Sequence, residues 1–326
     1  MTAPPPMFTS LDRCWICGGR DLRPVHRLLF EFSNYERQDP GLARYTDQRL
    51  DLVRCRACGF AQPAGLPTLP DYFGRMYDQR WSADWMAREF ASGYKDLIFH
   101  SVLGALARLV PAPRRRLLDL GAHVGRLLRL ARDAGWTAEG VELNPQTAAF
   151  AAHATGLPVH RADARTLIAA GRQYDAVTLI DVLEHIPDPV AMLATARALV
   201  APGGWIAVKV PHGPVQLRKE IWRARVVRGY RATVADNLVH VNHFSPRTLA
   251  LALERAGFGD VHVGPAAPEI TQPEDAPRGR RWAMNGMRRT AYALARILPG
   301  GTQTPFTLHL QAYARAEQGG PARGAS

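Results

Sequence analysis

The fold of this chain is decided by one stretch of its sequence, Leu117-Leu118-Asp119-Leu120-Gly121-Ala122-His123-Val124-Gly125-Arg126. An apolar run that contains an acid, a glycine turn and an amphipathic pattern follow one another here, which predicts a strand, a tight turn and a helix. In an α/β sheet such a turn presents backbone amides to a small cofactor. The turn alone is weak evidence about which cofactor binds, because nicotinamide enzymes share it.

The same alternation continues along the chain and predicts the fold class. Short apolar strands are expected at 116–120, 138–142, 158–161, 174–180 and 205–211, and helices at 125–134, 145–155 and 189–200. Strands that alternate with helices form βαβ units and a parallel sheet. After residue 211 the order changes, with helices expected at 215–231, 246–256 and 282–297 and strands at 260–264 and 305–314. The sequence therefore predicts an α/β protein.

Acidic residues lie at the predicted strand ends, where a cofactor would bind. Glu142 ends the second strand, where a carboxylate can accept hydrogen bonds from both hydroxyls of a ribose. Asp163 follows the third strand, where an acid can accept the hydrogens of an adenine amino group. Asp119 lies two residues before the first glycine, and Asp181 follows the fourth strand. A Pro-Gly-Gly turn at 202–204 then leads into the fifth strand.

With these features in this order, the chain resembles the class I S-adenosylmethionine-dependent methyltransferases over about residues 116–264. The resemblance implies a Rossmann-like sheet of seven strands with the last strand antiparallel. It also implies S-adenosylmethionine as the cofactor. By position it assigns Gly121 and Gly125 to the methionine part, Glu142 to the ribose and Asp163 to the adenine.

Three further positions bear on this cofactor site. Asp119 is expected to support the glycine loop and the amino group of the cofactor, and Asp181 is expected to be a further cofactor-binding residue. The family usually has G-x-G-x-G, whereas His123 replaces the middle glycine here. Because S-adenosylmethionine carries no pyrophosphate, it needs a less close backbone approach than a dinucleotide. His123 either touches the methionine part or the substrate, or it turns to solvent or packs on the helices expected at 70–110.

The four cysteines form two pairs, Cys14-x-x-Cys17 and Cys55-x-x-Cys58, each followed by glycine. Four thiolates held in two such turns suit tetrahedral zinc. Disulfides or unrelated thiols are the alternative, and the lack of a recognisable secretion signal disfavours disulfides. Because cysteine fills all four ligand positions, no position is left for a reactive water, and the zinc is expected to be structural.

The cysteine pairs narrow the resemblance. The stretch Arg54-Cys55-Arg56-Ala57-Cys58-Gly59-Phe60 and the aromatic residues after it resemble the zinc-bearing subgroup that includes sugar C-methyltransferases. In that subgroup an E-H-x-x-[YF]-F-S stretch is thought to supply the base. The matching stretch at 239–245 keeps His240 but has Val239 in place of the glutamate and His243 in place of the aromatic residue. The departure weakens the case for keto-sugar C-methylation and fits a broader group of small-molecule methyltransferases equally well.

Methyl transfer to a carbon or a hydroxyl requires removal of a proton, which histidine can perform near pH 7. Histidines are expected near the carboxyl ends of the strands, where ligands of open α/β sheets bind. We rank the catalytic candidates in the order His240, His185 and His243. The alternative for His240 is a turn histidine that binds backbone groups, and for His185 a residue that shapes the cofactor loop.

The charge of the chain permits an anionic partner. The formal net charge of the 326 residues is +12, and arginine supplies 38 of the 41 basic residues. Residues 215–231 and 278–289 concentrate this charge. A nucleotide-linked substrate, RNA and an acidic lipid surface are the partner classes, and a solvated basic face is the alternative. No apolar run approaches the roughly 20 residues of a membrane span, and a cytoplasmic location with at most peripheral membrane contact is expected.

The expected organisation is a disordered tail (1–10), a zinc-binding module (11–69), a helical linker (70–110), the methyltransferase domain (111–316) with a basic helical insert (212–236), and a second disordered tail (317–326). The expected function is S-adenosylmethionine-dependent C- or O-methylation of a small molecule: a sugar, a sugar nucleotide or a natural-product intermediate. An RNA methyltransferase and a non-catalytic binding protein with a decayed methyltransferase fold are the alternatives.

Overall fold

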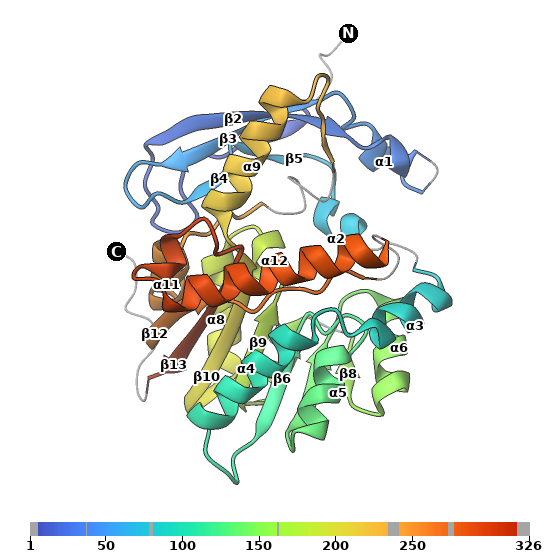
Figure 1. Ribbon diagram of the computed structural model, residues 1–326, viewed down its shortest axis with the longest axis vertical. Helices are drawn as coiled ribbons and strands as arrows, with labels where there is room; N and C mark the ends of the chain where they lie inside the picture. The colour runs from blue at the N-terminus through green and yellow to red at the C-terminus, as the bar shows by residue number, and fades with distance from the viewer. Residues whose placement is uncertain are drawn as a thin grey trace.

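A seven-stranded sheet forms the centre of the computed structural model, which describes residues 6–36, 38–77, 81–161, 163–233, 241–272 and 277–317 (Figure 1). The strands lie in the order β12-β13-β10-β9-β6-β7-β8. Their bounds are β6 (Arg116–Leu120), β7 (Thr137–Val141), β8 (Val159–His160), β9 (Tyr174–Ile180), β10 (Val200–Pro211), β12 (Phe258–Pro265) and β13 (His309–Ala316). Strand β13 is antiparallel to both of its neighbours, and the other pairs are parallel. The structure confirms the predicted α/β sheet with an antiparallel last strand.

The strand order creates a switch point at β6. This strand lies between β7 and β9, so the chain leaves it in opposite directions across the sheet. Because side chains alternate along a strand, Leu117 enters the core on one face and Leu118 the core on the other. Ligands of open α/β sheets bind outside the carboxyl ends of the strands at such a point. The glycine turn that follows β6 therefore lies where a ligand is expected.

Helices cover both faces of the sheet (Figure 1). One face packs against α7 (Ala164–Ala169), α8 (Pro189–Leu199) and α11 (Pro246–Arg255). The other face packs against α4 (Asp96–Leu109) and α5 (Arg126–Asp133), with α6 (Pro145–Thr155) beside α5 and α12 (Arg278–Ile297) on the same side. Two single turns, η2 (Leu183–His185) and η4 (Gly301–Gln303), complete this part.

A smaller sheet lies over the carboxyl-end edge of the large one (Figure 1). Its order is β11-β2-β3-β4, with the bounds β2 (Leu22–Glu31), β3 (Arg49–Cys55), β4 (Ala61–Pro63) and β11 (Ala232–Thr233). The short strands β1 (Phe8–Ser10) and β5 (Gly65–Pro67) pair beside it, and η1 (Ser33–Tyr35) and α1 (Pro40–Ala43) lie between β2 and β3. Aromatic rings such as Phe30, Phe32 and Tyr45 fill the core of this module.

The basic segment after β10 packs on the smaller sheet. Helix α9 (Gly213–Val226) buries Leu217 in the aromatic core, with Ile221 packed against that core. Strand β11 then extends the sheet beside β2. Trp222 and Val226, one turn apart on α9, remain exposed. The insert after β10 of the large sheet therefore packs on the small sheet and connects the two.

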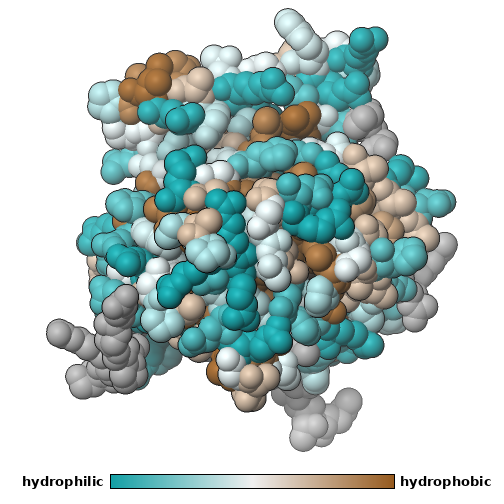
Figure 2. Space-filling view, turned by 90° about the horizontal axis from the view of Figure 1, so that it is seen from below, coloured by the Kyte–Doolittle hydropathy of each residue, from teal (hydrophilic) through white to brown (hydrophobic). Residues whose placement is uncertain are grey.

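The expected helical linker consists of α2 (Tyr72–Tyr77), α3 (Ala83–Ser92) and α4. Its aromatic residues have different neighbours: Tyr72 packs in the core of the small module and Phe99 in that of the large sheet. None of the helices in the described residues has both the length and the apolar composition needed to cross a bilayer. Seen from below, the end of the molecule away from the small module is mostly hydrophilic (Figure 2).

Candidate functional site

A cavity of about 1300 Å³ opens at the carboxyl ends of the parallel strands. The turn after β6, the residues that follow β7 and β9, and the end of β10 line one side of it. Trp81 and Trp85, which begin α3, and the loop before α12 line the other side. Pockets that bind one small ligand usually measure about 300–1000 Å³. The cavity is therefore large enough for a cofactor and a second molecule.

The turn after β6 needs its glycines. Gly121 has φ +84°, and a Cβ atom added there would lie 2.4 Å from Cγ2 of Val182. Gly125 has φ +82° and begins α5. The amides of Gly121 and Ala122 both donate to the carbonyl of Val141 in the neighbouring strand, at 2.9 and 3.0 Å. The turn is thus anchored to the end of β7. Only a glycine fits at position 121, because Val182, two residues after β9, lies against it.

Glu142 joins the two strand ends. Its Oε2 accepts a hydrogen bond from the amide of His123 at 2.8 Å, and its Oε1 accepts one from the amide of Asn144 at 2.8 Å. Each carboxylate oxygen has a second lone pair, so the half-buried Glu142 retains acceptor capacity toward the cavity that it lines. A pair of neighbouring hydroxyls, as on a ribose, matches this acceptor.

His123 adopts a left-handed backbone conformation, with φ +49°. Its ring packs edge-on against Trp85, with the centroids 5.6 Å apart, and Trp85 stacks on Trp81. Burial and the nearby Lys95 lower the pKa of His123 to about 4, so its ring is neutral at pH 7. His123 packs on α3, as the second alternative predicts, and it also lines the cavity.

The two other expected cofactor acids differ in burial. Asp119 is buried and accepts a hydrogen bond from Oγ1 of Thr178 at 2.6 Å. Burial, together with the charge of Glu142 and against the Thr178 bond, raises the pKa of Asp119 to about 7. Asp163 caps the N-terminus of α7 by accepting from the amide of Arg165 at 2.9 Å, and its side chain is 58% exposed. Both acids line the cavity.

Asp181 lies in a buried cluster of charges. Lys95 donates to its Oδ2 at 2.7 Å and Lys209 donates to its Oδ1, while Nζ of Lys209 also lies 3.1 Å from Oε1 of Glu269. The side chain of Lys209 is 1% exposed. Burial opposes ionisation of Asp181, but the two lysines outweigh it and hold the pKa of Asp181 well below its usual range. Both carboxylate oxygens of Asp181 are thus engaged with lysines.

The histidines ranked as catalytic candidates lie in different places. His185 lines the cavity in η2, with its Nε2 3.9 Å from Oε1 of the buried Glu184. His243 does not line the cavity: its backbone bridges to Ala61 of the small sheet, and its buried ring nitrogens have no hydrogen-bond partner among the described residues. Burial and the charge of Arg54 lower the pKa of His243 to about 4. His240 lies outside the described residues.

Among the cavity residues that sequence reasoning missed are Lys95, Lys209, Glu269 and His309. His309 begins β13, and its Nδ1 is buried with no hydrogen-bond partner among the described residues. Burial and the charge of Lys209 lower the pKa of His309 to about 4. The one signal in the sequence was Lys209, a charged residue inside an apolar strand of a chain with three lysines. The other three come from segments far apart in the chain.

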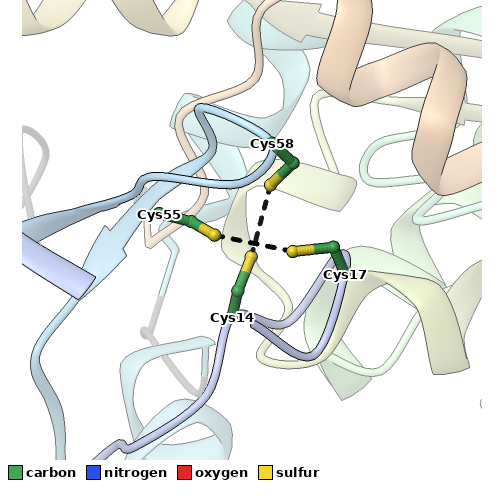
Figure 3. A group of neighbouring side chains, drawn as sticks. All are labelled: Cys14, Cys17, Cys55 and Cys58. Atoms are coloured by element: carbon green, nitrogen blue, oxygen red, sulfur yellow. Dashed lines mark hydrogen bonds between the residues drawn. The ribbon is translucent and has the colours of Figure 1, made fainter. Parts of the chain in front are cut away.

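The four cysteines meet in one cluster (Figure 3). All four sulfur atoms lie within 4.8 Å of one another, with Sγ of Cys14 3.5 Å from Sγ of Cys58 and Sγ of Cys17 3.5 Å from Sγ of Cys55. None is in a disulfide. The amides of the following glycines turn back to Cys14 and Cys55 at 2.8 and 2.9 Å, which forms the two knuckles. Zinc–sulfur bonds of about 2.3 Å in a tetrahedron place the sulfurs just under about 4 Å apart, so the cluster fits a zinc ion.

Comparison with known proteins identifies the family. A methyltransferase domain family model matches residues 92–263, which is more than half of the chain, and the chain belongs to that family. It is 36% identical over 94 residues to the ubiquinone biosynthesis O-methyltransferase of Dinoroseobacter shibae, covering 27% of this chain and 38% of that protein. It is 37% identical over 98 residues to the enzyme of the same name from Bordetella avium, covering 28% and 41%. The chain thus spans about two fifths of the length of the curated relatives it matches.

Among solved structures, the chain is similar to a SAM-dependent methyltransferase from Archaeoglobus fulgidus. The TM-score is 0.44 and the identity 19%, and the match covers 72% of this chain and all of the other.

The charge cluster leads to a prediction about stability. Replacing Asp181 with asparagine leaves Lys209 and Lys95 with one carboxylate between them, so Asp181→Asn is expected to lower the free energy of unfolding at pH 7 by about 3 kcal/mol. Because the folded-state pKa of Asp181 is depressed, its contribution is complete above the unfolded value of about 3.9 and is lost as the pH falls below it. Urea denaturation at pH 7 and pH 3.5 measures this, and the gap between wild type and variant should shrink at the lower pH.

Asp12→Asn is the matched control, since Asp12 is exposed and its nearest cation, Arg13, is 4.0 Å away. Equal losses of unfolding free energy in the two variants would contradict a specific contribution of the buried cluster to stability.

Proposed function

We propose that this chain transfers a methyl group from S-adenosylmethionine to a small molecule bound in the cavity at the carboxyl ends of the strands. One observation carries the proposal: Glu142 and the glycine turn beside it line a single large cavity. Glu142 can accept hydrogen bonds from ribose hydroxyls, and the cavity is larger than one small ligand needs. Membership in the methyltransferase domain family supports it. S-adenosylmethionine, when bound, supplies an electrophilic methyl group.

The residues of the chain fit that cofactor along one side of the cavity. Glu142 accepts the ribose hydroxyls, Asp163 accepts from the adenine amino group, and Gly121 leaves space for the methionine part. Gly125 does not line the cavity, and its lack of a side chain instead lets the turn pack closely on α6. Asp119 supports the turn from beneath through its buried carboxyl group. Asp181 and the two lysines beside it lie at the end of β9, where the charged amino and carboxylate groups of the methionine part require partners of both signs.

The acceptor then occupies the other end of the cavity, beside Glu269 and His309. We infer that His309 takes the proton from a hydroxyl acceptor. Two features support this role: His309 lines the cavity, and its buried Nδ1 is unpaired within the described residues. His185 is the second candidate, because it also lines the cavity. Proton removal by a positioned base contributes typically about 10²–10⁴ in rate.

The proposed methyl acceptor is a small molecule that offers a hydroxyl or a nucleophilic carbon: a sugar, a sugar nucleotide or a natural-product intermediate. The names of the relatives, ubiquinone biosynthesis O-methyltransferases, favour transfer to oxygen.

Neither the RNA methyltransferase nor the non-catalytic alternative gains support from the site. The histidine in the glycine turn, which suggested decay, is compatible with an intact turn because Glu142 accepts its amide.

Methyl transfer is tested with S-adenosylmethionine labelled in the methyl group and a panel of phenols and nucleotide-linked sugars. Wild-type protein is expected to label at least one acceptor. His309→Ala should lower turnover at least a hundredfold, while the dissociation constant for S-adenosylmethionine stays within about twofold, because His309 lies at the acceptor end. His262→Ala, at an exposed position of β12, is the control and should behave as wild type.

Unchanged turnover in His309→Ala would remove His309 as the base and leave the methyl transfer standing. Labelling of no acceptor by wild-type protein that does bind the cofactor would contradict the proposed acceptor classes.

We further propose that Cys14, Cys17, Cys55 and Cys58 bind one structural zinc ion. The cluster brings together two knuckles that begin and end the β2–β3 region, so the ion would close the small module. All four positions are sulfur, which leaves no site for a reactive water. Binding of a metal to this module adds directly to its folding free energy.

Metal analysis of protein purified without chelator is expected to give about one zinc per chain. Prolonged treatment with a strong chelator should release it, expose four thiols to a thiol reagent and lower the melting temperature. Cys55→Ser should bind zinc much more weakly than wild type. A wild-type protein that carries no metal and shows four reactive thiols in its native state would contradict the assignment.

A further inference from the structure

The outward-facing surface of α12 carries apolar side chains at positions where surface helices usually carry charged ones. Its outermost positions recur every three or four residues, and all are exposed and uncharged: Trp282, Gly286, Thr290, Ala293 and Ile297. Trp282 is 81% exposed, Ile297 75%, and Met287 beside them 66%. Surface helices usually turn their apolar stripe to the core and their charges to water. Here the apolar residues at the outside lack a partner within the described part of the chain.

Arginines border this apolar face. Helix α12 holds six arginines and no acidic residue, and Arg278, Arg289 and Arg296 are exposed along one side of the apolar face. Within the described residues, none of the six takes part in an ion pair. The helix therefore presents, next to exposed apolar side chains, positive charge that no acid of the described residues pairs with.

We propose that α12 is an interfacial helix that lies on an anionic phospholipid surface. Trp282, Met287 and Ile297 enter the boundary between headgroups and acyl chains, and the arginines beside them bind lipid phosphates. Arginine suits phosphate because its planar fork can donate two hydrogen bonds. The proposal rests on the surface of α12 alone and is independent of methyl transfer.

The arrangement of the two kinds of residue favours a membrane over RNA or an acidic protein. Nucleic acid is bound mainly through contacts of cations with phosphates, which would place the arginines outermost. On α12 the outermost residues are uncharged and include Trp282 and Ile297, and the arginines lie to the side of them. Helix α12 also runs uncovered across the side of the molecule that faces the viewer in Figure 1. A flat lipid surface can contact the whole helix there.

The same helix borders the acceptor end of the cavity. Asn285 accepts a hydrogen bond from the amide of Thr271 at 2.8 Å, and Arg288 donates to the carbonyl of Glu269 at 3.0 Å, so α12 holds the loop that lines the cavity. A second cavity of about 220 Å³ is lined by Arg288 and Tyr292 of α12 and shares Glu269 and His309 with the large one. Contact with a membrane would therefore place the lipid surface next to the acceptor end.

The test is co-sedimentation of the full-length protein with vesicles of phosphatidylcholine alone or with phosphatidylglycerol added. Binding is expected only to the vesicles that contain phosphatidylglycerol. Replacing Arg278, Arg289 and Arg296 together with serine should weaken that binding roughly a hundredfold, since each arginine near an anionic surface contributes about 1 kcal/mol. The control replaces Arg20, Arg114 and Arg247, which are exposed arginines of other segments, and changes the net charge by the same three units.

Insertion is measured separately from adsorption. Phosphatidylcholine with brominated acyl chains, mixed into the anionic vesicles, should quench part of the tryptophan fluorescence of wild-type protein, and Trp282→Phe should abolish most of that quenching. Failure to bind anionic vesicles at low salt, or equal weakening by the two triple variants, would overturn the proposal. Binding without quenching would show adsorption of charge alone, which also contradicts an interfacial helix.

Discussion

The shape of the cleft depends on one carboxylate. Glu142, at the end of β7, accepts the amide of His123 in the turn after β6 and the amide of Asn144 that begins the next helix. The contact fixes two strand ends that are also joined through the carbonyl of Val141. It also explains how a histidine is accommodated in a left-handed turn position, because the amide is satisfied and the ring packs on Trp85. Without the Glu142 side chain, the turn would keep its two hydrogen bonds to Val141 but lose the acceptor of the His123 amide.

A second constraint is the buried charge cluster that lines the cavity. Removing Lys209 and Asp181 from water costs free energy that their mutual attraction and the bonds of Lys95 and Glu269 have to offset. Such a cluster adds little net stability, but it fixes where charges of both signs lie. The glycine turn and His309 line the same cavity as this cluster.

The sequence predicts the sheet well because its signals are local. Strand and helix periods, the glycine turn and the acids at the strand ends each depend on a few neighbouring residues, and so do the paired cysteines. The acceptor end of the cavity depends on distant contacts, because Lys95, Lys209 and His309 come together only when α4, β10 and β13 meet. His243 shows the same limit: its place after the basic segment suggested the cleft, but pairing with Ala61 buries it beside the small sheet. The packing of α9 on that sheet joins residues nearly 200 positions apart, which no local pattern encodes.

The central claim is that the cleft beside β6 binds S-adenosylmethionine through Glu142. Isothermal titration of the full-length protein with S-adenosylmethionine tests it most directly, with Glu142→Ala compared to Glu254→Ala, a change at an exposed position of α11. The account predicts one saturable site in wild type and in Glu254→Ala, and binding at least tenfold weaker in Glu142→Ala. Absence of binding to wild-type protein, or equal affinity in the two variants, would contradict it.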